Sequence, residues 1–169
     1  MTPPLIKTSD PDFMLRIATE EDAGLVVAFM HKLGVYQKMA EAITATEAEI
    51  ARLLRENLGE AVIASYLGEP VGFVYFCKKS SAFTGRAGLF IDGFLIDEDM
   101  RHKGFGKIMM GFMCRHAIER NCQMLEWGCL DWNAPTIQFY KDLGAYSIEN
   151  MRIFRFTPDQ LRINAALHV

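Results

Sequence analysis

Three β-rich runs follow one another in the middle of this 169-residue chain, and together they limit the fold more than any other feature. The first two, "AVIASYL" and "VGFVYFC", are separated by the tripeptide "GEP" at residues 68–70, a connection short enough to predict an antiparallel hairpin. The third, "LFIDGFLI" at residues 89–96, follows a turn around Thr84 and Gly85. The middle of the chain is therefore predicted to be a sheet.

Helix signals precede this sheet. The stretch "FMLRIA" alternates like a strand, and Thr19 after it caps a helix whose end is marked by Gly34. Thr46 and Glu49 have the spacing of a capping box, which predicts a second helix that runs through Leu58. One strand and two helices are therefore expected before the hairpin.

Helices and strands alternate after the sheet. Apolar residues recur at helical spacing over residues 107–120, "MLEWGCL" is typical of a short strand, and residues 135–143 predict another helix. The stretch "RIFRF" at residues 152–156 predicts a late strand, and Thr157 caps one last helix. This order predicts an α/β fold, an α+β sandwich with a mixed sheet and helices on both faces.

Composition indicates a single core. With 169 residues and 50% hydrophobic content, we expect one domain over residues 13–169, preceded by a flexible N-terminal segment at residues 1–12. The 18 basic and 21 acidic side chains give a net charge of −3, which argues against a general nucleic-acid or membrane-surface binder. Neither nucleic acid nor membrane is therefore an expected partner.

Two further patterns indicate a cytoplasmic protein. The chain start lacks the charged and apolar regions of a signal peptide, and no apolar run approaches the ~20 residues of a membrane span. The four cysteines have no C-x-x-C spacing and lie in apolar contexts, so we expect buried, reduced thiols and no metal site.

The loop "RHKGFGK" at residues 101–107 is a candidate anion site. It lies directly before a predicted helix, whose first amide groups have no internal acceptors and whose dipole favours negative charge. Gly104 and Gly106 would let an anion touch the backbone, and the arginine and two lysines of the loop add positive charge. The pattern therefore predicts a phosphate cradle.

The loop differs from two other phosphate-binding motifs. A Walker motif requires glycine at position 101 and serine or threonine at position 108, where Arg101 and Ile108 stand. A dinucleotide fingerprint requires a third glycine at position 109, which is Met109. A simple connecting loop on the surface remains the alternative to a cradle.

The loop and a later segment together resemble the GCN5-related N-acetyltransferase (GNAT) superfamily. Arg101-x-x-Gly104-x-Gly106 resembles its pyrophosphate loop, and "LDWNAPTIQFYKDLGA" at residues 130–145 resembles its N-x-x-A/S-x-x-F/Y-Y segment. Within the superfamily, "LFIDGFLI", "LGVYQKM" and the 130–145 segment are most similar to the diamine (spermidine/spermine and thialysine) acetyltransferases. The resemblance implies direct transfer of an acetyl group from acetyl-coenzyme A (acetyl-CoA) to a primary amine in a ternary complex.

The resemblance also implies a fold and a set of coenzyme contacts. It predicts a mostly antiparallel sheet in which two central parallel strands splay apart at a β-bulge near Gly93, so that the pantetheine arm lies in the gap. The implied coenzyme-binding residues are Phe94, Leu95, Ile96, Arg101, His102, Lys103, Gly104, Phe105, Gly106, Lys107, Asn133, Ala134, Pro135, Thr136 and Tyr140.

Two residues are the implied catalytic pair. Tyr140 matches the family tyrosine near the coenzyme sulfur, and a phenol with a pKa of roughly 10 suits a general acid. Asp92 occupies the position where the diamine enzymes carry a glutamate that orients or deprotonates the amine. The alternatives are core packing for Tyr140 and a solvated strand carboxylate for Asp92.

Substrate contacts follow from the same resemblance. The implied amine-binding residues are Tyr36, Gln37, Asp92, Glu126, Trp127 and Gly128. Glu126 and Trp127 could receive an alkyl-ammonium group, although the tryptophan suits a core or an interface equally well. A small primary amine is therefore the expected acceptor, whether a diamine, a polyamine or an amino-acid-like molecule.

The sequence leaves open one expectation about assembly and two alternative functions. Many relatives form dimers through the C-terminal strand or the strand before it, and residues 152–156 have the β-rich pattern for this, so the resemblance implies a homodimer. A noncatalytic acyl-CoA-binding regulatory module would keep the cradle and lack turnover. A protein N-terminal or lysine acetyltransferase would use the same fold with a wider acceptor groove.

Overall fold

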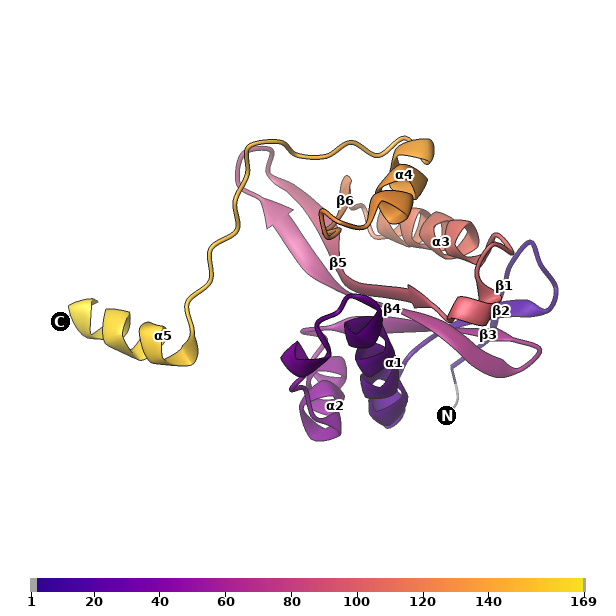
Figure 1. Ribbon diagram of the computed structural model, residues 1–169, viewed down its shortest axis with the longest axis horizontal. Helices are drawn as coiled ribbons and strands as arrows, with labels where there is room; N and C mark the ends of the chain where they lie inside the picture. The colour runs from indigo at the N-terminus through magenta and orange to yellow at the C-terminus, as the bar shows by residue number, and fades with distance from the viewer. Residues whose placement is uncertain (1–2, 169) are drawn as a thin grey trace. The chain divides into compact units, whose positions relative to one another are not determined.

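The computed structural model describes residues 3–168, and its main feature is one six-stranded sheet (Figure 1). The strands lie in the order of the sequence: β1 (Ile6–Lys7), β2 (Phe13–Ile17), β3 (Glu60–Tyr66), β4 (Glu69–Ser81), β5 (Arg86–Ile96) and β6 (Met124–Trp127). Neighbouring strands are antiparallel except β5 and β6, which are parallel. The predicted mixed, mostly antiparallel sheet is therefore confirmed.

Helices connect and cover these strands. The α-helices are α1 (Ala23–Tyr36), α2 (Glu47–Arg55), α3 (Phe105–Glu119), α4 (Ala134–Asp142) and α5 (Pro158–Ala165). Short 3-10 turns lie at Glu20–Asp22, Ala40–Ala42, Glu98–Met100 and Ala166–His168. The Thr46 hydroxyl accepts a hydrogen bond from the Glu49 amide at the start of α2, so the predicted capping box is confirmed.

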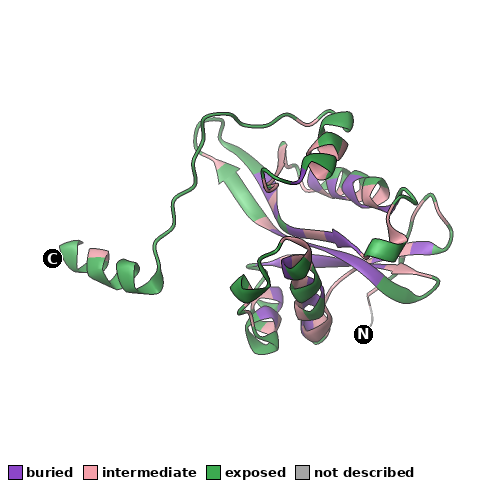
Figure 2. Ribbon diagram, viewed as in Figure 1, coloured by how far each residue is buried: buried purple, intermediate pink, exposed green. Residues whose placement is uncertain are grey.

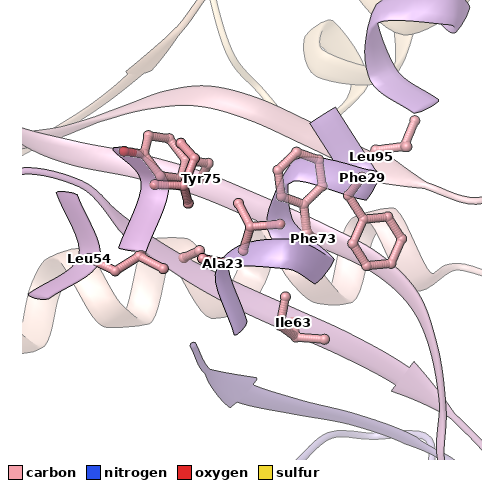
Figure 3. Close-up of a cluster of buried hydrophobic side chains, with 10 residues drawn as sticks. Ala23, Phe29, Leu54, Ile63, Phe73, Tyr75 and Leu95 are labelled. Atoms are coloured by element: carbon pink, nitrogen blue, oxygen red, sulfur yellow. The ribbon is translucent and has the colours of Figure 1, made fainter. Parts of the chain in front are cut away.

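One face of the sheet packs against α1 and α2 (Figures 1 and 3). Phe29 of α1 stacks on Phe73 of β4 with ring centroids 5.4 Å apart, and Tyr75 and Leu95 belong to the same buried cluster. The other face packs against α3, where the Phe105 ring stacks on that of Phe13 at 4.1 Å. The middle of the sheet is buried on both faces between helices, whereas the end of β4 and the start of β5 are exposed (Figure 2).

The chain divides into two compact units, Met1–Leu130 and Asp131–Val169. The first unit, residues 1–130, holds the whole sheet with α1, α2 and α3, and the second unit, residues 131–169, holds α4 and α5. The single domain over residues 13–169 stays a prediction.

Two predicted helix ends are wrong. Helix α1 continues two residues past Gly34, which is a close-packing site and not a helix end: a Cβ there would lie 2.7 Å from the Ile43 side chain. Helix α2 ends at Arg55, before Leu58, because Asn57 adopts a left-handed conformation that ends the helix.

Predictions for the ends of the chain and for the cysteines also need correction. Residues 152–156 form no strand and are exposed, because a strand needs a neighbour and no described strand pairs with this segment. Within the segment expected to be flexible, Ile6 and Lys7 form β1. None of the four cysteines is fully buried, and Cys114 is exposed because it lies on the outer face of α3.

Candidate active site

The glycine loop ends in a left-handed residue directly before α3. Gly104 is the N-cap of the helix with φ of 85°, and the first helical hydrogen bond runs from the Ile108 amide to the Gly104 carbonyl at 3.1 Å. The three preceding amides, of residues 105–107, therefore have no acceptor within the helix. Among the described residues, no side chain accepts a capping hydrogen bond at this helix end. This geometry is the one expected of an anion site at a helix start, and binding of an anion here stays a prediction.

The loop residues divide into side chains that face the core and groups that face solvent. Phe105 is buried against Phe13, so only its backbone is available to a ligand. His102, with φ of 63°, and Lys107 are exposed. Lys103 places its ammonium 5.2 Å from the ring centroid of Tyr66.

Arg101 connects the loop to the end of α1. Its Nε donates a hydrogen bond to the Ile96 carbonyl at 3.1 Å, and its guanidinium lies 4.5 Å from the centroid of the Tyr36 ring. Lys32 of α1 forms an ion pair with Asp97, the residue after β5, at 2.8 Å. The structure therefore brings together Tyr36, Ile96 and Arg101, which the sequence had assigned separately to the amine and to the coenzyme.

Strands β5 and β6 separate beside this loop. They pair only from Gly88 to Ile91, where Ile91 lies opposite Trp127, while β5 continues to Ile96. Because β6 ends at Trp127, the described strands leave β5 without a partner on this side from Asp92 to Ile96, as the predicted splay requires. Leu95 and Ile96 have buried side chains, so this stretch can offer a ligand mainly its backbone.

A β-bulge lies at the point of separation. Tyr75 of β4 is opposite Gly93 and Phe76 is opposite Ile91, which leaves Asp92 as the extra residue. The bulge is one residue earlier than the predicted Gly93. It reverses the alternation of β5, so that Ile91 lies on the α3 side and Leu95 joins the cluster under α1 and α2.

Asp92 is exposed, and its charge acts on two neighbours on the α1 and α2 side. Burial, more than the nearby Asp92 carboxylate, raises the pKa of the Tyr75 phenol and of the Cys77 thiol. Both groups are therefore held in their neutral forms, which makes Cys77 a poor nucleophile. The role of the exposed Asp92 carboxylate as a catalytic group stays a prediction.

A lysine that the sequence analysis missed lies on the same surface. Lys79 of β4 forms an ion pair with Glu126 of β6 and places its ammonium 5.8 Å from the ring centroid of Phe90, on the strand between them. Alternation from Tyr75 and Cys77 puts Lys79 on this face, but the predicted strand ended at Cys77 and so hid the signal.

The remaining predicted amine-binding residues lie at the ends of elements. Tyr36 is the last residue of α1 and Gln37 follows it, both partly buried. Trp127, partly buried, ends β6, and Gly128 after it is exposed.

The second unit carries the family-like segment. Asn133, 6% exposed, is the N-cap of α4, and Pro135 lies in the first turn with Ala134 and Thr136. Tyr140 and Phe139 are both partly buried, with ring centroids 5.4 Å apart. The roles of Asn133–Thr136 and Tyr140 towards the coenzyme stay predictions.

A match to a family model identifies the protein family of this chain. The model of the acetyltransferase (GNAT) family matches residues 26–145, which include the sheet from β3 onward, the glycine loop and α4. This chain belongs to the acetyltransferase (GNAT) family. Among its residues 3–168, no helix is long and apolar enough to cross a membrane.

Curated relatives of this GNAT protein include amine acetyltransferases. It is 30% identical to an L-ornithine N5-acetyltransferase of Arabidopsis thaliana, over 70% of this chain and 49% of the relative, so it spans about half the length of that protein. It is 27% identical to a thialysine N-epsilon-acetyltransferase of Bos taurus, over 88% of this chain and 95% of the relative. Family and relatives support an acetyl-transfer enzyme.

Solved structures share the fold of this GNAT protein. An integron cassette protein from Vibrio cholerae is similar with a TM-score of 0.73 and 22% identity, over 91% of this chain and 98% of the other. An aminoglycoside acetyltransferase from an uncultured soil metagenomic sample gives a TM-score of 0.75 at 14% identity, over 88% and 97%. At these identities the likeness shows the fold alone.

Proposed function

We propose that this protein transfers an acetyl group from acetyl-CoA to a small primary amine by direct attack. The observation that carries the proposal is that the open end of β5 and the mouth of α3 follow one another in a single unit. Residues 94–96 offer backbone for an amide-containing arm, and the amides of residues 105–107 offer donors for a diphosphate. The residues present therefore fit the coenzyme, which would supply an activated acetyl thioester.

Asp92 is the proposed general base that deprotonates the acceptor amine. The attacking amine must be neutral, so a carboxylate at the bulge would accept a proton from the ammonium form, directly or through water. Its exposed position beside the separating strands supports this role. Tyr140 is the proposed donor of a proton to the departing thiolate, on the strength of its place in the family segment.

Relatives support an amine as the acceptor. The two curated relatives described above are named for ornithine and thialysine, which are both amino acids with a side-chain amine, and another match is named for spermidine and spermine; the proposal extends the class of small amines to this chain. The two other activities considered, a noncatalytic acyl-CoA-binding module and a protein acetyltransferase, give different outcomes in the same assay.

The test is thiol release from acetyl-CoA with a panel of amines, together with calorimetry of coenzyme binding. Asp92→Asn and Tyr140→Phe should lower turnover by about 10²- to 10⁴-fold, the range for a lost general base or acid. Asp99→Asn and Tyr146→Phe, which change exposed residues elsewhere, are the controls and should keep full activity. Coenzyme binding without turnover of any amine would favour the regulatory module, and turnover of peptides alone would favour the protein acetyltransferase.

A homodimer through residues 152–156 is also part of the proposal. Ile153 and Phe154 are among the most exposed apolar side chains described, and the segment alternates as a strand would. Light scattering after size-exclusion chromatography should give twice the mass of the chain at micromolar concentration. A monomer there, or a dimer that persists in Ile153→Asp, would contradict this interface.

A further inference from the structure

The ion pair of Lys79 and Glu126 joins three strands on the proposed amine side. Lys79 comes from β4 and Glu126 from β6, and Phe90 of β5 lies between them in register with Glu126. The two charged side chains are 42% and 28% exposed, so both can be reached by a ligand. The Lys79 ammonium lies over the Phe90 ring, so this site presents two opposite charges beside an aromatic side chain.

This pair lies close to the proposed reaction point. Phe90 precedes the bulged Asp92 by two residues, which corresponds to about 7 Å along a strand. The side chains of Phe90 and Lys79 share the face on which Asp92 affects Tyr75 and Cys77. A small amine with its reacting nitrogen at Asp92 would therefore place its other end at the ion pair.

The charges of the pair decide what that other end can be. The Glu126 carboxylate already pairs with the Lys79 ammonium, so any second ammonium at Glu126 competes with Lys79 and is repelled by it, and only an amino acid also brings a carboxylate that Lys79 can bind. A carboxylate and an ammonium on one carbon would instead meet Lys79 and Glu126 respectively. The zwitterionic head of an amino acid thus matches both charges, and the distal end of a diamine matches one.

We infer that Lys79 is a specificity-determining residue, which with Glu126 receives the α-carboxylate and α-ammonium of an amino-acid acceptor and disfavours diamines. The inference rests on the proposed amine acetyltransferase activity. It assigns to Lys79 the binding of the carboxylate and the exclusion of a second ammonium. The reacting side-chain amine then lies towards Asp92.

The test compares two acceptors that differ only in the carboxylate, L-ornithine and 1,4-diaminobutane. The wild-type protein should have the higher kcat/KM for ornithine. Lys79→Met, which keeps length and removes charge, should lower the ratio of the two kcat/KM values by about three- to tenfold, since an exposed pair contributes modestly and the change acts on both acceptors. Lys79→Arg should keep the preference.

Lys78→Met is the matched control. Lys78 is the adjacent exposed lysine of β4, on the opposite face of the strand, and its loss should leave the ratio unchanged. Equal effects of Lys78→Met and Lys79→Met, or an unchanged ratio in Lys79→Met, would overturn the inference. A wild-type protein that prefers the diamine, or that acetylates other amines and neither of these two, would overturn it without any variant. Loss of all amine turnover would instead count against the proposed function.

Discussion

Alanine at two glycines of the α3 region should change stability in opposite directions. Gly104 has φ of 85°, whereas Gly111 lies on the exposed side of α3 in ordinary helical geometry. A Cβ added at either position meets no atom within 4 Å, so crowding contributes to neither change. A comparison of Gly104→Ala with Gly111→Ala therefore measures the effect of backbone conformation on stability without a contribution from crowding.

The expected magnitudes follow from that conformation. A left-handed backbone costs an alanine roughly 1–2 kcal/mol, so Gly104→Ala should lower the free energy of unfolding by that amount. Within a helix alanine is favoured over glycine by about 0.8–1.0 kcal/mol, so Gly111→Ala should raise it. The two variants should differ by about 2–3 kcal/mol.

Urea unfolding followed by circular dichroism measures both changes. In thermal scans each kcal/mol corresponds to about 2–4 °C for a chain of this size. Gly104→Asn, which tolerates the left-handed region, should lose less than Gly104→Ala. Calorimetry should show weaker coenzyme binding for Gly104→Ala and unchanged binding for Gly111→Ala. Equal stability of the two alanine variants would refute the argument from φ, and unchanged coenzyme affinity in Gly104→Ala would refute the role of the helix mouth.

Three shorter predictions follow. Hydrogen bonds from the guanidinium of Arg16 lower the pKa of Asp22, so this carboxylate stabilises the fold above its unfolded pKa of about 3.9, and the stability is lost as pH falls below that value. In urea melts across pH 2–6, Asp22→Asn should flatten this fall. Gly59→Ala would bring a methyl group against the hydroxyl of Tyr75 and should cost about 1–3 kcal/mol in the same melts. Tyr36→Leu removes the ring beneath a guanidinium and should lower kcat/KM two- to fivefold, equivalent to about 0.5–1 kcal/mol, whereas Tyr36→Phe should not; equal losses would point to the hydroxyl instead.

Local sequence signals, such as helix caps, predicted most helices and strands, because each signal depends on residues only a few positions apart in the chain. The capping box at Thr46 and the cap at Thr157 both formed where the sequence placed them. These local signals gave wrong predictions where contacts between residues far apart in the sequence determine the structure. Gly34 is a packing site for the next loop and not a helix end, and the alternating residues 152–156 have no strand beside them in the described chain.

The sequence by itself determined the β-rich runs, the glycine loop before α3 and, through the family-like segment, the class of protein. All three depend on residues adjacent in the chain. Only the tertiary structure decided that Asp92 is the bulged residue and that Lys79 lies against Glu126, 47 positions away in the sequence. The physical reason is strand pairing, since one extra residue on β5 reverses which side chains share a face, and no local pattern records its partner strand.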